Sequence, residues 1–264
     1  MRTDALIGLI VICAIIVPLI AFAVLRGKAG LAGLSSRWWL ALYAVAFLFQ
    51  PLFLMRKHWE GAWVLSNPSL STMVFAQVDN AWWEELAKLL AIVVIAWLAR
   101  AEFMPLLRRL PSAVGLGFWA GLAYGAGEAV VLAILFTVPS LGPVFGVRTF
   151  TPFTIGWDFV YDRFWAIQFH AAMCALIGAG VWLWVSGRRW GGAAWFVVAM
   201  LYHHLVDGSI ILASFVPAIA VLLTRLGPWV LPLFAAIGYG LIALAYFGLR
   251  RQSNAATLVE ADAR

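Results

Sequence analysis

Residues 113–136 read AVGLGFWAGLAYGAGEAVVLAILF, an apolar stretch that contains a single charged residue, Glu128. About 20 consecutive apolar residues in a helix cross the roughly 30 Å hydrocarbon core of a bilayer. The stretch therefore predicts a transmembrane helix, and it predicts a carboxylate inside the membrane.

The rest of the chain has the same character. Its 264 residues are 64% hydrophobic and 11% charged, whereas soluble domains are about 45–50% apolar and about 25% charged. This composition excludes a water-soluble globule and leaves no room for a second, soluble domain. Uninterrupted apolar length predicts seven transmembrane helices, at residues 5–25, 39–55, 81–99, 113–136, 162–186, 192–215 and 228–249.

The predicted fold class is all-α, a polytopic bundle of seven transmembrane helices. Residues 1–251 form a single integral membrane domain, and residues 252–264 form a short flexible cytoplasmic tail. Residues 216–227 are apolar over only half the length of a span and are interrupted at Pro217. They form the tail of the sixth helix, a re-entrant turn or a short extra helix, which would raise the count to eight.

The basic residues near the ends of the predicted spans indicate the orientation. The chain has 18 Lys and Arg against 12 Asp and Glu, a net charge of +6, and eleven of the basic residues fall on one side of the bundle against six on the other. Lys and Arg are concentrated in cytoplasmic loops. We therefore expect a multi-pass protein of the cell membrane with its amino terminus outside and its carboxyl terminus in the cytoplasm. The positive charge then reflects the topology of the chain in a lipid membrane, and no nucleic-acid partner is expected.

Ionisable residues lie inside four of the predicted spans, where a charge near the bilayer centre costs at least about 2.5–3.5 kcal/mol. A single such residue is often explained by a hydrogen bond that joins two helices. Here the residues fall on spans three, four, five and six, and under the predicted topology they share one depth near the outer surface. The pattern predicts a polar site between these four helices, made of Glu84, Glu85, Lys88, Glu128, His170, His203, His204 and Asp207.

Residues three or four positions apart share one face of a helix. Lys88 follows Glu85 by three residues and Glu84 by four, so it can neutralise one glutamate while the other stays available. Arg163 precedes His170 by two turns, which places both on the same face.

Two further patterns concern the neighbouring spans. Asp207 lies within one turn of both His203 and His204, so either imidazole can be held by this carboxylate. The fourth span carries glycines 117, 121 and 125 at small-xxx-small spacing. Such a face allows another helix to approach its backbone closely, which places Glu128 at a tight helix junction.

Carboxylates and imidazoles in a partly wet membrane cavity support general acid–base chemistry. A glutamate in this setting can take a proton from water and return it to a leaving amine. A histidine beside a carboxylate can donate a hydrogen bond to a developing oxyanion. The sequence lacks the Gly-x-Ser-x-Gly, His-Glu-x-x-His and paired Tyr-Asp and Gly-x-Gly-Asp motifs, which disfavours serine, thermolysin-like and presenilin-type aspartyl mechanisms. These residues suffice for peptide hydrolysis without a covalent nucleophile.

Four motifs carry a family resemblance. Residues 84–88 (EELAK) resemble the Glu-Glu-x-x-Lys/Arg motif of the PrsW-like and YhfC-like membrane proteins, relatives of the CAAX prenyl protease and bacteriocin-processing (CPBP) glutamic intramembrane proteases. Residues 121–128 are similar to their Gly-rich second motif, and His170 and residues 203–207 (HHLVD) resemble the third and fourth. The resemblance covers residues 80–210, with the motifs in the family's order. Ala166 and Ala129 depart from its pattern and leave the subfamily and substrate class open.

The resemblance implies an intramembrane protease that acts on membrane proteins or membrane-associated peptides and requires no cofactor. It implies Glu84 as the base that activates water, supported by Glu85 and Glu128, with His170 as water ligand or polariser, His203 or His204 with Asp207 as the oxyanion partner, and Lys88 and Arg163 in supporting positions. Some members of this grouping are described as metalloproteases. A Zn²⁺ ion would then be held by His170 and by His203 or His204, together with Glu128 or Asp207.

Two other classes of function remain open. Intramembrane Glu, His and Asp residues also serve as proton relays in transporters. Transporter folds usually show two matched halves, and the sequence contains no such repeat. A non-catalytic accessory protein would not explain four polar groups at one depth.

Overall fold

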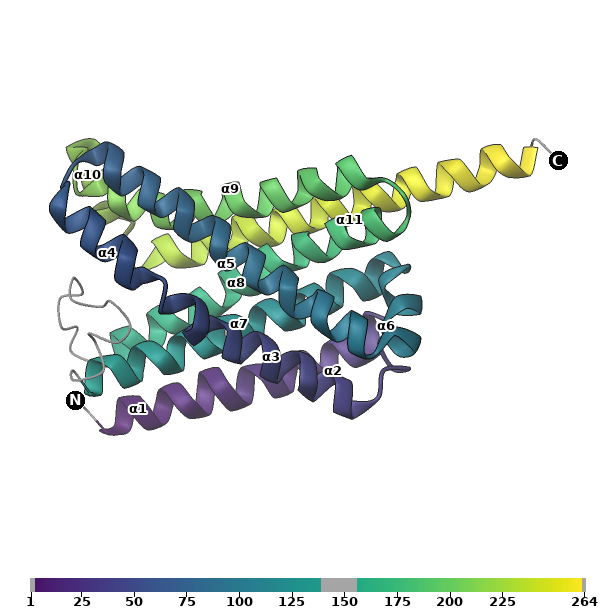
Figure 1. Cartoon of the computed structure of the whole chain (residues 1–264), viewed down its shortest axis with the longest axis horizontal. Helices are drawn as coiled ribbons and strands as arrows, with labels where there is room; N and C mark the ends of the chain where they lie inside the picture. Colours follow the sequence, from purple (N-terminus) through teal and green to yellow (C-terminus); the bar gives the residue numbers. More distant parts are fainter. Residues whose placement is uncertain (1–2, 139–155, 263–264) are drawn as a thin grey trace.

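The structure is a computed structural model that describes residues 3–138 and 156–262 (Figure 1). Every regular element in these ranges is a helix, which confirms the predicted all-α fold class. In chain order the elements are α1 (Thr3–Leu9), η1 (Ile10–Ile16), α2 (Val17–Lys28), α3 (Ser36–Leu54), α4 (Lys57–Ser66), α5 (Leu70–Leu98), α6 (Arg100–Leu107), α7 (Leu110–Thr137), α8 (Trp157–Val185), α9 (Arg189–Ala213), α10 (Pro217–Leu226), η4 (Gly227–Trp229) and α11 (Val230–Asp262).

Six helical segments of the described chain are long and apolar enough to cross a membrane: Asp4–Lys28, Ser36–Leu54, Leu110–Leu135, Trp157–Val185, Arg189–Ala213 and Pro217–Gln252. They correspond to six of the seven predicted spans. The remaining prediction, residues 81–99, falls in α5. This helix is long enough to cross a membrane, but it is too highly charged to be recognised as a span from length and composition alone. Its charged residues are Asp79, Glu84, Glu85 and Lys88.

The first segment, Asp4–Lys28, is one continuous helix with a widened turn. Pro18 has no backbone N–H, and its ring crowds the carbonyl group of Ala14, four residues earlier. The helix accommodates this by opening into the π-helical η1, after which α2 continues to Lys28.

The last candidate segment, Pro217–Gln252, begins with a short, separate helix, α10. Val216 has extended backbone angles, φ −120° and ψ 100°, and Pro217 begins α10. Gly227 then ends the helix with a φ of +52°, which glycine adopts at little cost. Beyond η4, α11 remains helical through Asp262 and projects past the bundle (Figure 1). The flexibility expected for residues 252–264 stays a prediction.

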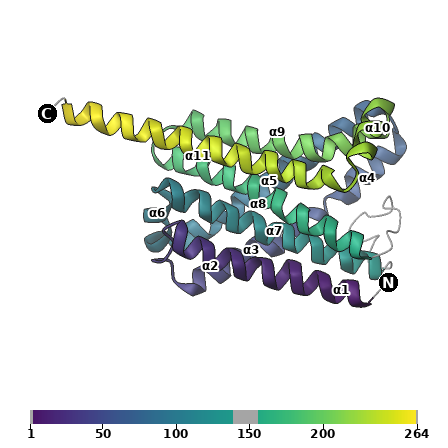
Figure 2. The ribbon, with the colours of Figure 1, turned by 180° about the vertical axis from the view of Figure 1, so that it is seen from behind.

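The centre of the bundle is formed by α7 and α8. In their apolar windows 72% and 89% of the residues are buried, against 17–28% in the other candidate spans. Figures 1 and 2 show the first helix and α3 on one side of this pair and α9 and α11 on the other. Helix α5 packs against both α3 and α9 and also contacts α7 and α8. It therefore brings its charged residues to the middle of the bundle.

The predicted glycine face is the contact between α7 and α8. A Cβ atom placed on Gly117 would lie 2.2 Å from the carbonyl oxygen of Cys174, and one on Gly121 would lie 2.1 Å from that of His170. A Cβ on Gly125 would lie 2.9 Å from the Cα of Ile167. Because no side chain fits at these positions, the backbones of the two helices touch.

The ends of the helices separate into two groups. The amino terminus, α4 and α10 lie at one end of the bundle, while α6, the α8–α9 turn and the carboxyl terminus lie at the other (Figure 1). At this second end Glu102 of α6 accepts hydrogen bonds from the backbone N–H of Ser35 (3.0 Å), from Trp38 Nε1 (3.1 Å) and from Arg37 (3.3 Å). These hydrogen bonds, above all the one from the Ser35 backbone, hold the pKa of Glu102 below its ordinary value of 4.5.

Candidate active site

Glu85 and Lys88 of α5 form a fully buried ion pair. Lys88 Nζ lies 2.6 Å from Glu85 Oε1, and both side chains are 0% exposed. The pair uses the i, i+3 spacing of the sequence motif. Lys88 therefore balances the charge of Glu85 inside the bundle, where an unpaired charge would be costly.

His203 of α9 links this ion pair to a second carboxylate. Its Nδ1 atom lies 2.7 Å from Glu85 Oε1, and its Nε2 atom lies 3.2 Å from Asp207 Oδ2 on the same helix. Glu84 Oε2 is 3.8 Å from the same Nε2 atom, beyond hydrogen-bond distance. Because both ring nitrogens face carboxylate oxygens, the ring can donate both hydrogen bonds only when it carries two protons.

The sequence analysis did not identify Gln77 as part of the site. Its Nε2 atom donates a hydrogen bond of 3.1 Å to Asp207 Oδ2. Gln77 precedes Glu84 by two helical turns, so the two residues share a face of α5. The spacing of seven residues could have indicated that Gln77 faces the site, but an uncharged amide is not unusual near the end of a helix.

A second acid–imidazole pair joins α7 and α8. His170 Nε2 lies 2.9 Å from Glu128 Oε2, and Arg163 Nη1 lies 3.4 Å from the same oxygen. Arg163 and His170 thus contact one carboxylate from one face of α8, as their spacing predicts. The Nδ1 atom of His170 is buried and has no hydrogen-bond partner in the described part of the chain.

Tyr124 brings the two pairs together. The ring centroids of His170 and His203 are 5.9 Å apart. The buried ring of Tyr124 lies 5.4 Å from the ring of His170 and has Lys88 Nζ 5.1 Å from its centroid. Residues from α5, α7, α8 and α9 therefore meet in one cluster, which we call the polar cluster: Glu84, Glu85, Lys88, Tyr124, Glu128, Arg163, His170, His203 and Asp207.

His204 lies outside the hydrogen bonds of the polar cluster. Its Nδ1 atom is buried without a hydrogen-bond partner among the described residues, and its ring lies against Gly208, one turn further along α9. Helical spacing allowed either histidine to meet Asp207. The contact with Glu85 on a different helix selects His203.

The predicted zinc ligands do not converge. Within residues 3–138 and 156–262, no three His, Cys, Asp or Glu side chains are grouped so that they could hold a metal ion. His170 is paired with Glu128, while His203 is paired with Glu85 and Asp207.

The polar cluster extends from the protein interior to the surface. Side-chain exposure rises from 0% at Glu85 to 7% at Glu84, 17% at Glu128 and 41% at Asp207. Its four carboxylates exceed the two permanent cations, Lys88 and Arg163. The cluster therefore joins carboxylates and imidazoles, which can accept and donate protons, from the buried interior to the surface.

A polar junction next to the cluster ties the end of α3 to α5. Arg56, after the end of α3, hydrogen-bonds Asp79, and it contacts Asn80 Oδ1 at 3.1 Å and Glu60 Oε2 at 3.0 Å. Asn80 is one turn before Glu84. Arg56 follows the predicted span 39–55, and its partners come from segments that helical spacing does not connect.

With this geometry in hand, the chain was compared with known proteins: no protein-family model, curated protein or solved structure matches it.

Proposed function

We propose that this protein is a membrane-embedded peptidase in which a glutamate activates water to hydrolyse a peptide bond of a membrane protein or membrane-associated peptide. The proposal includes membership of the PrsW-like and YhfC-like group of glutamic intramembrane proteases. The observation that carries it is the meeting of two acid–imidazole pairs, His203 with Glu85 and His170 with Glu128, beside Glu84.

The roles of the two adjacent glutamates differ in this proposal. Glu85 is committed to Lys88 and His203 at 2.6 and 2.7 Å, which favours a positioning role. Glu84 Oε2 lies 3.8 Å from His203 Nε2, and its side chain is 7% exposed. As the family resemblance implies, Glu84 is the general base that takes a proton from water, and Glu85 holds the imidazole.

The reaction follows from these positions. The oxygen of water attacks the scissile carbonyl carbon while its proton passes to Glu84. His203, held by Glu85 through Nδ1, exchanges the contact of its Nε2 atom with Asp207 for a hydrogen bond donated to the oxyanion. His170, oriented by Glu128, has its buried Nδ1 atom as a further position for water or substrate. The C–N bond then breaks, and Glu84 returns the proton to the leaving amine.

The membrane topology is part of the proposal. Adding α5 to the six apolar candidates gives seven spans, with α10 as a short helix that does not cross. With the basic end of the bundle in the cytoplasm, the amino terminus is outside. Four residues of the polar cluster then lie roughly 13–21 Å from the outer ends of their helices, at 1.5 Å per residue: Glu84, Glu128, His170 and His203. An epitope tag after Arg264 that an external protease removes from intact cells would contradict this orientation.

The adjacent histidines provide a matched test of the site. Purified protein in liposomes is assayed against a panel of single-pass membrane substrates. We expect Glu84→Gln to lower the rate by about 10²–10⁴-fold, the usual contribution of a general base. His203→Gln should lower it strongly, whereas His204→Gln, on the same helix, should retain activity. Undiminished cleavage by the Glu84→Gln, Glu85→Gln double variant would refute the glutamate mechanism.

One observation favours a second candidate, a proton-coupled transporter. The hydrogen-bonded series Glu85, His203, Asp207 leads from a fully buried carboxylate to one that is 41% exposed, which suits proton transfer. A transporter would show no hydrolysis and would carry a flux driven by a pH gradient. In that case Glu85→Gln should abolish the flux in the same liposomes.

A further inference from the structure

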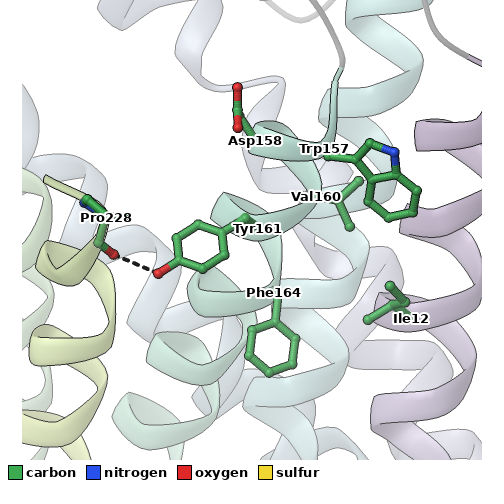
Figure 3. Close-up of a pocket in the computed structure, with 7 residues that line it drawn as sticks. All are labelled: Ile12, Trp157, Asp158, Val160, Tyr161, Phe164 and Pro228. Carbon is green, nitrogen blue, oxygen red and sulfur yellow. Dashed lines mark hydrogen bonds between the residues drawn. The ribbon is translucent and has the colours of Figure 1, made fainter.

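A groove runs along one lateral face of the bundle, between the first helix and α8. At the amino-terminal end of α8 it is a hollow of about 580 Å³ lined by Ile12, Asp158 and Tyr161, among others (Figure 3). A second hollow of about 430 Å³ runs along α2 between Val17 and Leu25. Phe164 lines both hollows, so the two are adjacent, and we call them together the lateral groove.

Two hydrogen bonds join α8 to its neighbours at the mouth of the lateral groove. Trp157 Nε1 donates to Asp4 Oδ2 at 3.3 Å and ties α8 to α1, while Tyr161 Oη donates to the carbonyl oxygen of Pro228 at 2.6 Å and ties α8 to η4 (Figure 3). A Cβ on Gly8 would lie 2.6 Å from the Trp157 ring, so the indole sits against the backbone of α1. Both α1 and η4 are therefore fixed to α8 beside the hollow.

The lining changes character along its length. The carboxylate of Asp158 and the aromatic rings of Trp157 and Tyr161 lie at the mouth. Below it the lining is apolar except for Gln168, which accepts a hydrogen bond from Tyr239. An apolar groove at membrane depth offers water almost no hydrogen-bond partners, so hydrocarbon fills it. Trp and Tyr are typical of the level of the lipid headgroups.

The length of the groove selects the kind of hydrocarbon. From Trp157 to Gln168 along α8 it measures about 16 Å at 1.5 Å per residue, close to half of the roughly 30 Å hydrocarbon core. A transmembrane helix of a partner needs the full thickness, whereas an acyl chain whose headgroup stays at the surface needs one leaflet. A carboxylate at the mouth attracts a headgroup with a positive charge.

We propose that the lateral groove binds one acyl chain of a phospholipid whose ammonium headgroup, as in phosphatidylethanolamine, lies beside Asp158. The site is a lipid site separate from the polar cluster, and it does not depend on the proposed peptidase activity. It would fix the first helix to α8 on the face where these helices leave a gap.

Photolabelling tests the proposal. The full protein is incorporated in bilayers that contain phosphatidylethanolamine with a photoreactive acyl chain, and labelled peptides are mapped. We expect label concentrated on residues 12–25 and 157–168 and several-fold less label from the phosphatidylglycerol analogue. Ala21→Phe, which fills the groove, should remove most of this label. Leu19→Phe adds the same ring to the exposed side of the same helix and should leave it unchanged.

The headgroup is tested separately with Asp158→Asn, which should remove the preference for phosphatidylethanolamine while the acyl chain still labels the groove. Label spread evenly over the membrane-facing helices of the wild-type protein would overturn the proposal without any variant. Displacement of the label by a transmembrane peptide, with no effect of added phosphatidylethanolamine, would identify the groove as a helix-docking site and would also overturn it.

Discussion

The substitution Gly121→Ala tests whether the contact between α7 and α8 sets the geometry of the polar cluster. The new Cβ would lie 2.1 Å from the carbonyl oxygen of His170, whereas ordinary contact begins near 3.4 Å. The two helices must therefore separate by about 1.3 Å at this point. Overpacking of this kind costs about 1–3 kcal/mol, and each kcal/mol lowers the melting temperature by about 2–4 °C in a chain of this size.

The same displacement acts on the site. Glu128 and His170 are 2.9 Å apart and lie on the two helices that would move. If the protein is a peptidase, a shift near 1 Å in this pair should lower its rate by about 10²-fold. Thermal unfolding in detergent and hydrolysis in liposomes measure the two effects. Gly240→Ala is the control, because a Cβ there meets nothing within 4 Å. Equal melting temperatures for Gly121→Ala and Gly240→Ala would refute the close packing.

Three further predictions concern two charged residues and the effect of a chelator. Lys88→Met should destabilise the fold by about 3–5 kcal/mol because it leaves the buried Glu85 carboxylate without its cation, and adding Glu85→Gln should restore part of the loss in thermal unfolding. The pKa of Glu102 is lowered in the folded state, so this residue stabilises the fold above its unfolded pKa, and the contribution is lost as pH falls through the folded pKa. Glu102→Gln should therefore reduce the loss of stability at acid pH in a curve of unfolding free energy against pH. An unchanged curve would count against the hydrogen bond from Ser35. If the protein is a peptidase, a chelator should leave hydrolysis unchanged, since the described residues offer no group of three metal ligands; inhibition by the chelator would favour the zinc alternative.

Local spacing predicted those contacts that lie within one helix or along one helix face. Spacing allowed Lys88 to pair with Glu84 or Glu85, and Asp207 with His203 or His204, and the structure contains one pair of each kind, Glu85–Lys88 and His203–Asp207. The shared face of Arg163 and His170 follows from residues seven apart. The glycine face of α7 followed in the same way. These features depend on helix geometry alone, which a sequence determines once a helix is recognised.

Contacts between helices distant in sequence could not be predicted in this way. Both His203 and His204 satisfy the spacing to Asp207, and only the packing of α5 against α9 brings His203 to Glu85, 118 residues away. Gln77 meets Asp207 across 130 residues, and its amide side chain gives no charge signal. The sequence likewise did not indicate where α5 begins, because its first turns are polar and exposed on one side.

The burial of α5 has a consequence for how the protein is made. This helix carries Glu84, Glu85 and Lys88, and each charge near the bilayer centre costs at least about 2.5–3.5 kcal/mol on insertion scales. Lys88 compensates Glu85 within the helix, but His203 belongs to a segment that the ribosome completes much later. If α5 spans the membrane, as proposed above, it must stay shielded by the insertion machinery or by neighbouring helices until α9 is made. Assembly of the polar cluster and completion of membrane insertion are then a single event.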